Sequence, residues 1–445
     1  MKKYPNLELV LYLVATTLVV RFLPGIEPFF VHGPESVYLS LSIVFLSGYL
    51  LNFKASKTYF PSFGWAILFG IALQPVLLGL VTNLPVLVVV IELLAALVLF
   101  GGGVEVPYDS FKKYIGPIAS LAILATLGTI YLFGLTLDAI GSVAGISIAG
   151  INFLVLAAIL SSIDPTAIIP SLKNVRLKRP FLKDLAVSES AVNDVVGTII
   201  TRVLLLAALG AAAGASVTGG FMILADRSVL DALALEFIWG LIVGVCGAWM
   251  LKKWLSALET STGKRNVHDP ALFFAVPIFC FAAGSIVGGS GFLAAFVAGL
   301  LFDASKPTKP VQDFFEAFGD GFIKPIVFVL LGALAPVALM IEYWWVGIIA
   351  AFIFMFIIRP LVVFVTLTPW AKDSDDVFTW QELSFISFVR ETGAIPAVLL
   401  LTLATTALDG ASELVAIGMW VILLTLMIEP PLTPWVARKL DLVKK

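Results

Sequence analysis

Charged side chains are scarce in this sequence, which excludes an ordinary water-soluble fold. Asp, Glu, Lys and Arg together make up 13% of the 445 residues, about half the share that is typical of soluble domains. Apolar residues make up 60%, and they come in runs of about 20, long enough for a helix to cross a hydrocarbon core. Because unpaired backbone groups are costly in lipid, each run is expected to be helical. The composition therefore predicts a helical bundle in a membrane.

Histidine and cysteine are nearly absent, and their positions exclude several kinds of chemistry. His32 and His268 fall in predicted loops, so the membrane interior has no imidazole for serine-type proteolysis. Cys246 and Cys280 lie in apolar runs, which argues against a disulfide framework or a thiolate metal site. No small-residue cleavage site follows the first apolar run, so we expect a retained helix there and not a signal peptide.

Apolar runs bounded by glycine, proline and charged residues predict 13 or 14 membrane-spanning helices. The junction at Gly288-Gly289 leaves open whether the two runs around it form two helices or one bent helix. The expected spans are residues 7–24, 40–53, 62–82, 84–101, 115–136, 150–170, 186–211, 229–252, 270–287, 289–304, 322–339, 342–368, 383–405 and 413–434.

The distribution of lysine and arginine predicts that both termini are cytoplasmic. Basic residues in short loops stay on the cytoplasmic side, and here they recur in every second predicted loop. The predicted outer loops contain Arg227 alone, with Arg21 near an outer helix end. Orientation in the membrane thus accounts for the basic loops without a nucleic-acid partner.

Ionisable residues inside predicted spans are energetically costly and mark candidate functional positions. Glu8 and Glu236 lie nearer helix ends, where water or snorkelling accounts for them. The others are Glu92, Asp164, Glu189, Asp194, Arg202, Arg359, Arg390 and Glu391.

Two of the predicted spans are interrupted next to such a charge. Pro165 and Pro170 break the helix beside Asp164, and the stretch 390–396, which begins with Arg390, is broken by glycine and proline. Two interrupted helices in corresponding halves of a chain are a strong sequence indication of a transporter site, because the freed carbonyls at the break can hold a cation.

A pair of polar residues in the span between them supplies a titratable group. Glu189 and Asn193 share one helical face, with Asp194 one step round. An ionised carboxylate binds a monovalent cation and a protonated one does not, so competition for Asp194 is itself an exchange mechanism. The alternative is that Asp194 is a structural carboxylate paired with Arg390 or Arg359.

These residues resemble motifs of the monovalent cation/proton antiporter family, in its NhaP-type branch of sodium/proton exchangers. Glu189-Ser190 followed by Asn193-Asp194 resembles the family's E-S-x-x-N-D signature, and Asp164-Pro165 resembles its D-P in the preceding broken helix. The resemblance covers nearly the whole chain after the first helix. Weaker similarities are Leu99-Phe100 with 101–103, residues 290–294, Arg359-Pro360 and residues 393–396.

The resemblance implies an all-α polytopic fold of the NhaA/NhaP-like type, with inverted repeats and two broken crossing helices. It implies an extra N-terminal helix and loop at 1–36, an exchanger domain at 37–434 and a short basic cytoplasmic tail at 435–445. It also implies a multi-pass homodimer in the cell (inner) membrane, without a cofactor and without a nucleic-acid partner.

The resemblance also implies a role for each motif residue. Asp194 is the carrier of cation and proton, and Asn193 holds the crossing of the broken helices. Asp164, Ser190 and the Ile163 carbonyl are candidate ligands of the monovalent cation, although the family usually has Thr at the Ile163 position.

A membrane ion pair completes the set of implied site residues. Glu189 is expected to pair with an arginine, and Arg359 matches the family's arginine. Thr392 occupies the place of a second family arginine, and Arg390 lies two residues earlier.

The implied function is secondary active antiport of Na⁺ or Li⁺ for protons by alternating access, with a role in pH homeostasis. Because Asn193 leaves a single carrier carboxylate, the exchange is expected to be electroneutral. A K⁺/H⁺ antiporter is the main alternative, followed by a proton-coupled transporter of another small solute and by a channel. An enzyme is disfavoured, since Phe318-Gly319-Asp320 lacks the first glycine of the G-x-G-D motif.

Overall fold

A computed structural model describes residues 5–22, 34–55, 62–163, 177–210, 212–262, 270–302, 316–371, 378–389 and 392–444. These residues are helical almost throughout, and the β-structure among them is one isolated bridge between Leu177 and Val443. Within these described ranges, seven helical stretches are long and apolar enough to cross a membrane. The predicted all-α membrane fold is confirmed.

The first half of the chain forms the helices from α1 to α13. They are α1 (Pro5–Phe22), α3 (Pro34–Ala55), α4 (Ser62–Ala72), α5 (Leu78–Val81), α6 (Leu84–Glu105), α7 (Tyr108–Lys113), α8 (Ile115–Ala119), the π-helical turn η2 (Ser120–Ala125), α9 (Thr126–Val143), α10 (Gly150–Ser161), α12 (Phe181–Leu209) and α13 (Val217–Met222).

The second half of the chain likewise contains both long helices and short ones. They are α14 (Arg227–Thr262), α15 (Pro270–Ile286), α16 (Gly291–Phe302), the π-helical segment η4 (Glu316–Ile323), α18 (Lys324–Ala333), α19 (Val337–Glu342), α20 (Trp344–Ile353), the π-helical turn η5 (Phe354–Ile358), α21 (Arg359–Leu367), α22 (Trp380–Phe388), α23 (Ala394–Ala404) and α24 (Ala411–Lys439).

The junction that the sequence left open is a turn between two helices. Gly288 has a φ of +79°, a left-handed conformation that glycine adopts without steric cost. The chain therefore reverses there, and α15 and α16 pack against each other. Other predicted bounds differ more from the structure: the span expected at 229–252 extends over 227–262, and the one expected at 40–53 over 34–55.

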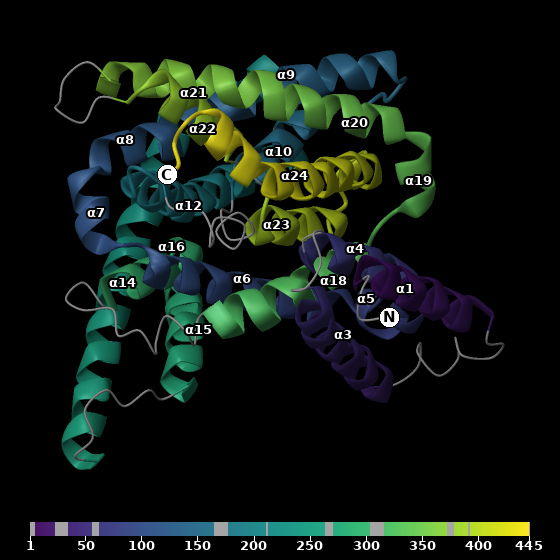
Figure 1. Cartoon of the computed structure of the whole chain (residues 1–445), viewed down its shortest axis with the longest axis horizontal. Helices are drawn as coiled ribbons and strands as arrows, with labels where there is room; N and C mark the ends of the chain where they lie inside the picture. Colours follow the sequence, from purple (N-terminus) through teal and green to yellow (C-terminus); the bar gives the residue numbers. More distant parts are fainter. Residues whose placement is uncertain are drawn as a thin grey trace.

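The helices separate into groups that Figure 1 distinguishes by position. One group contains α8 to α13 and α20 to α24, and it forms the upper part of the view (Figure 1). The helices α14 to α16 and the N-terminal helices α1 to α5 form two lower groups, while α6 and α18 cross the middle. Contacts between α6 and α23, α18 and α23, and α12 and α6 connect the upper group to these crossing helices.

Paired glycines bring two helix pairs into unusually close contact. A Cβ built on Gly299 of α16 would lie 2.1 Å from the Phe100 carbonyl oxygen of α6, and one on Gly332 of α18 would lie 2.1 Å from the Ile67 carbonyl oxygen of α4. Small residues at helix contacts allow such close packing in membranes, where association relies on van der Waals contact.

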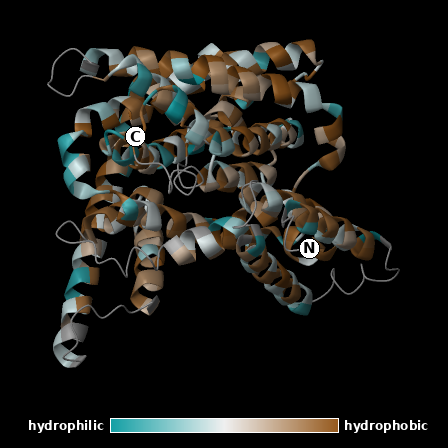
Figure 2. Ribbon diagram, viewed as in Figure 1, coloured by the Kyte–Doolittle hydropathy of each residue, from teal (hydrophilic) through white to brown (hydrophobic). Residues whose placement is uncertain are grey.

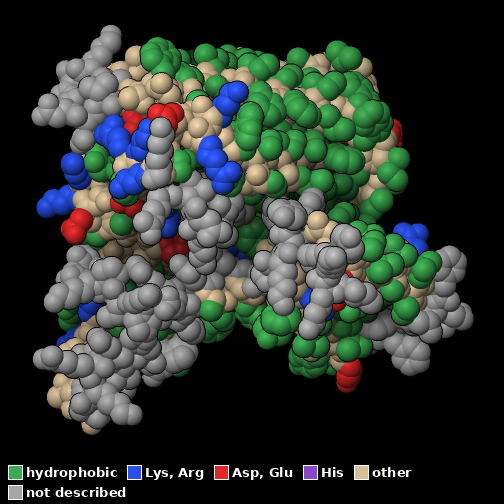
Figure 3. Space-filling model, viewed as in Figure 1, with side chains coloured by type: hydrophobic (Ala, Val, Ile, Leu, Met, Phe, Trp, Pro, Cys, Tyr) green, Lys and Arg blue, Asp and Glu red, His purple; other side chains and the backbone are tan. Residues whose placement is uncertain are grey.

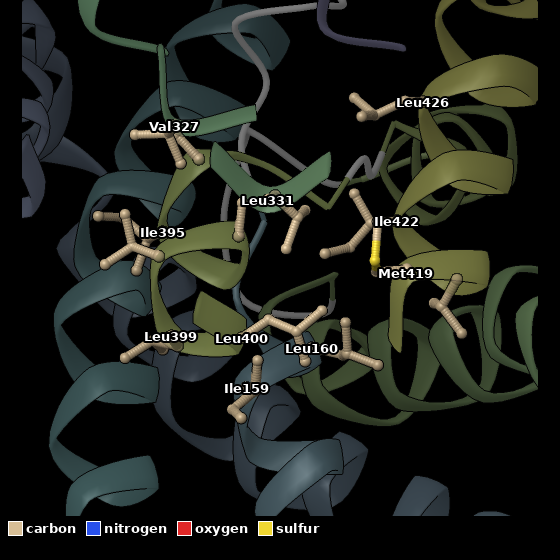
Figure 4. Close-up of a cluster of buried hydrophobic side chains, with 14 of the residues drawn as sticks. Ile159, Leu160, Val327, Leu331, Ile395, Leu399, Leu400, Met419, Ile422 and Leu426 are labelled. Atoms are coloured by element: carbon tan, nitrogen blue, oxygen red, sulfur yellow. The ribbon is translucent and has the colours of Figure 1, made fainter. Parts of the chain in front are cut away.

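Apolar side chains fill the space where the interrupted helices meet their neighbours. Figure 4 shows Leu160 of α10, Leu331 of α18, Leu400 of α23 and Ile422 of α24 pointing toward one another. All four are fully buried. This cluster joins α10 to α23 next to the polar breaks described below.

The outer surface has the distribution expected of a membrane protein. The helices are predominantly hydrophobic along their length (Figure 2), and the upper right of the space-filling view is covered by apolar atoms (Figure 3). Exposed apolar residues of α20 to α21, such as Phe352, Ile357 and Val365, belong to this lipid-type surface. Lysine, arginine and acidic side chains gather on the left of the same face, near the C-terminus.

Candidate functional site

The first interrupted helix ends where the sequence predicts the break. Helix α10 stops at Ser161, and Ser162 is extended, with φ −74° and ψ 146°. Ser162 and Ile163 are both buried, so this backbone leaves the helix inside the bundle. Asp164 lies outside the described residues.

Asp194 lies beside this break. It occupies the middle of α12 with 8% of its surface exposed, and its Oδ1 accepts a hydrogen bond from the Ser162 hydroxyl. The approach is close because Gly197, one turn further along α12, has no side chain: a Cβ there would lie 3.3 Å from Ser162 Cβ. The carboxylate and the end of α10 thus meet directly.

Two further side chains of α12 hold the unwound backbone at Ile163. The Ile163 amide donates to Asn193 Oδ1 at 3.2 Å, and the Ser190 hydroxyl donates to the Ile163 carbonyl at 2.7 Å. A buried backbone group without a partner is costly, so Asn193 and Ser190 stabilise the break. A carbonyl oxygen has two lone pairs, which leaves the Ile163 oxygen a second position for a ligand.

The second interruption lies between α22 and α23. Helix α22 ends at Phe388 and α23 begins at Ala394; Arg390 lies outside the described residues. Thr392 is fully buried, and its hydroxyl accepts a hydrogen bond of 2.9 Å from Thr425 of α24. Helix α10 packs against α23, so the two interrupted segments are neighbours.

Glu189 and Arg359 form a buried ion pair in the same region. The Arg359 Nη2 atom lies 2.7 Å from Glu189 Oε1, and the two side chains are 3% and 2% exposed. Arg359 directly follows the π-helical turn η5, and Pro360 explains that turn, since proline lacks an amide hydrogen and clashes with the carbonyl four residues earlier. The structure therefore brings together this predicted pair.

A cavity of about 330 Å³ opens along α12 beyond Asp194. Its wall includes Thr198, which lies one turn after Asp194. The Thr198 hydroxyl donates a hydrogen bond of 2.6 Å to the Asp194 backbone carbonyl. The wall is built by α6, α12, α15, α16 and α23, and Glu92 and Arg202 are its charged residues. A cavity with two charged residues in its wall thus begins within one helical turn of Asp194.

The oxygen atoms at the break suit a hard monovalent cation. The Asp194 carboxylate, the Ser162 and Ser190 hydroxyls and the Ile163 carbonyl are gathered from α10 and α12. Unwound carbonyls beside a carboxylate are the ligands that secondary transporters use for Na⁺ and H⁺. Within the described ranges, no group of three or more His, Cys, Asp or Glu side chains could hold a metal ion.

Sequence reasoning missed several polar residues that the fold buries. Ser162 contacts Asp194, and its position directly before the Ile163-Asp164 break was an available signal. Lys324 and Glu429 lie inside predicted spans but were absent from the set of membrane charges; they are 5% and 2% exposed. Glu382, 2% exposed, lies just before a predicted span and pairs with Arg179 at 3.1 Å.

Comparison with solved structures identifies the fold. The structure of the sodium proton antiporter MjNhaP1 from Methanocaldococcus jannaschii matches with a TM-score of 0.73 and 20% sequence identity, covering 90% of this chain and all of that one. The predicted all-α antiporter fold is therefore confirmed.

Curated relatives share about a quarter of their residues with this chain. A protein named K(+)/H(+) antiporter NhaP2 from Shewanella sp. (strain MR-4) is 27% identical over 342 residues, which is 76% of this chain and 55% of that protein. A probable Na(+)/H(+) antiporter 2 from Methanocaldococcus jannaschii is 24% identical over 378 residues, 81% of this chain and 82% of that protein. The chain thus spans about half the length of the NhaP2 relatives.

The family profile matches almost the whole chain. The profile described as "Sodium/hydrogen exchanger, transmembrane" aligns with residues 41–439, which include both interrupted helices, α12 and Arg359. This family consists of secondary transporters and not of enzymes, as the sequence predicted. The chain belongs to the sodium/hydrogen exchanger family.

Proposed function

We propose that this protein exchanges a monovalent cation, Na⁺ or Li⁺, for protons, with Asp194 as the carrier. The observation that supports the proposal most strongly is the buried Asp194 carboxylate facing the unwound end of α10, where Ser162, Ser190 and Ile163 add oxygen atoms. Asp164 is proposed as a further ligand. Cation and proton compete for this carboxylate, so loading one releases the other.

The exchange is proposed to be electroneutral. Asn193 is next to Asp194, and its side-chain oxygen accepts the Ile163 amide hydrogen bond, so it acts as a structural group and carries no proton. One carrier carboxylate then exchanges one proton for one cation, and the rate is independent of the membrane potential. A transport rate that responds to an imposed potential would contradict this stoichiometry.

A K⁺/H⁺ antiporter is the second candidate. The Shewanella NhaP2 relatives and an NhaP protein from Alkalimonas amylolytica are named K(+)/H(+) antiporters, whereas the Methanocaldococcus relative is named for Na(+). Ile163 stands where the resembled family usually carries a threonine, so one hydroxyl ligand is missing.

Alternating access is proposed to come from movement of one helix group against the other. The oxygen-rich break lies between α10 and α12 in the upper group, while α14 to α16 form a lower group and α6 crosses the middle (Figure 1). We place the protein in the inner membrane as a homodimer with both termini cytoplasmic. We also keep the division into an N-terminal helix and loop at 1–36, an exchanger domain at 37–434 and a basic tail at 435–445.

Cation uptake driven by a pH gradient tests the proposal. Proteoliposomes with an acidic interior are mixed with radiolabelled Na⁺ or with Rb⁺ as a tracer for K⁺, and the membrane potential is clamped with an ionophore. Accumulation of one tracer that collapses when the pH gradient is removed supports antiport and identifies the ion. No accumulation of either tracer would contradict cation/proton exchange.

A further inference from the structure

Arg202 holds a positive charge inside the cavity beyond Asp194. It lies on α12, eight residues after Asp194, which corresponds to about 12 Å along the helix. Its side chain is 53% exposed and lines the cavity, although it lies within a predicted membrane span. A charged side chain in such a position normally faces water or a functional path.

Two carboxylates from other helices lie in the neighbourhood of this guanidinium. Arg202 Nη1 lies 3.9 Å from Glu236 Oε1 of α14, and Glu92 of α6 lines the same cavity. The remaining polar lining side chains are neutral: Thr198, Thr201, Ser285 and Thr402. In the cavity wall itself the charge of Arg202 cancels that of Glu92, and Glu236 contacts Arg202 from outside this wall.

The position of Arg202 relates it to the path of a cation. The cavity begins one turn from the carrier carboxylate at Thr198 and continues to Arg202. A cation that reaches Asp194 from this side passes through the electric field of all three charges. Carboxylates that line a cavity raise the local concentration of cations, and a fixed guanidinium lowers it.

We propose that Arg202 controls cation access from the cavity side: as a tethered cation between Glu92 and Glu236, it weakens the apparent affinity of Asp194 for the transported ion on that side. This inference rests on the proposed exchange function. Arg202 does not contact the ion in its site; it acts through the field in the cavity. Cation binding from the opposite face of the membrane, by a path that does not pass Arg202, should be unaffected.

The size of the effect follows from Coulomb's law. If the helical rise of about 12 Å is taken as the separation of the two unit charges, their interaction changes a binding constant about tenfold at an effective dielectric constant near 20. Water in the cavity reduces this toward about threefold. At a pH at which Asp194 is ionised, the Arg202→Gln variant should therefore lower the apparent KM for the cation on the cavity side by about three- to tenfold, with Vmax much less changed.

The matched variants separate charge from shape. Arg202→Lys keeps the charge and should retain the wild-type KM, whereas Glu92→Gln removes an attracting charge and should raise the KM on the cavity side. Glu342→Gln, at an exposed carboxylate at the end of α19, serves as a control that leaves KM unchanged. Raising the ionic strength with choline chloride should shrink the difference between wild type and Arg202→Gln, since salt screens charges that water reaches.

The experiment measures sided cation kinetics in proteoliposomes with uniform protein orientation. A KM that falls for Arg202→Gln on one face only, with wild-type values for Arg202→Lys, supports the inference. An unchanged KM, equal changes on both faces, or the same shift in Arg202→Lys would overturn it. If wild-type protein exchanges no cation for protons, both the proposed function and this inference fail. If wild-type exchange is normal and the KM of the Arg202 variants does not change, only this inference fails.

Discussion

Glu189 of α12 and Arg359 of α21 neutralise each other inside the bundle, with 2.7 Å between Oε1 and Nη2. Both side chains are almost completely buried, so neither charge has solvent as an alternative partner. The pair joins α12, which carries Asp194, to the helix that follows the π-helical turn η5. It thereby fixes the helix that carries Asp194, the proposed carrier, without using the Asp194 carboxylate.

The Glu189→Ala variant should reduce the amount of folded protein more than it reduces the transport rate of each folded molecule. Removing one partner of a buried ion pair leaves the other charge uncompensated, at a cost of about 3–5 kcal/mol. The yield of monodisperse protein and its melting temperature in detergent measure the loss. A Glu189→Leu/Arg359→Met double variant should recover part of it. A Glu189→Ala protein that is fully stable yet inactive would instead place Glu189 in transport.

Where α6 contacts α16, an added methyl group should be tolerated at Gly102 and not at Gly103. A Cβ on Gly103 would lie 2.3 Å from the Phe296 carbonyl oxygen, whereas one on Gly102 would meet no atom within 4 Å. Overpacking typically costs about 1–3 kcal/mol, so Gly103→Ala should lower the melting temperature and Gly102→Ala should not. Equal melting temperatures of the two variants would contradict this packing.

Asn193 should tolerate an isosteric change better than a truncation. Asn193→Ala leaves the buried Ile163 amide without its 3.2 Å acceptor, which costs about 1–3 kcal/mol and should disorder the break. Asn193→Asp retains an acceptor oxygen and adds a second titratable group beside Asp194. We expect little transport from the first variant, and potential-dependent transport from the second. Potential-independent transport by Asn193→Asp would contradict the proposal that the number of carboxylates at the site determines how many protons are exchanged.

The first turn of α22 should depend on Glu382. Its carboxylate accepts from Arg179 Nη1 at 3.1 Å and from the Thr379 amide at 2.9 Å. Glu382→Ala removes both contacts, each a hydrogen bond with a charged partner worth about 1.5–3 kcal/mol. Hydrogen exchange should therefore accelerate in residues 379–384 while α24, as an internal control, stays protected. Glu382→Gln keeps the cap and should show a smaller effect, and unchanged exchange in both variants would contradict the role.

The general fold could be predicted from the sequence because lipid imposes strong rules. Apolar runs must be helical, and the breaks at Pro165 and Gly393 stand out within them. The positions of Glu189 and Asn193 on one face of α12 followed from helical spacing. These features are local, so a single sequence contains them.

Contacts between distant segments were harder to predict. The glycine contact between Gly103 and Phe296 and the pairing of Arg202 with Glu236 depend on which helices are neighbours, and helix spacing does not determine this. Glu236 was interpreted as a solvated helix-end residue, yet its partner comes from α12. The contact of Ser162 with Asp194 was not predicted, because Ser162 was interpreted only as part of the break.

Proton flux through reconstituted liposomes tests the central claim, the role of Asp194, most directly. A pH-sensitive dye is followed in vesicles that contain wild-type protein or Asp194→Asn, while Na⁺, Li⁺ or K⁺ is added in turn, and both proteins are first shown to be equally folded. The account predicts that one of these cations collapses the pH gradient with wild-type protein and none with Asp194→Asn. Equal flux through both proteins would contradict Asp194 as the carrier.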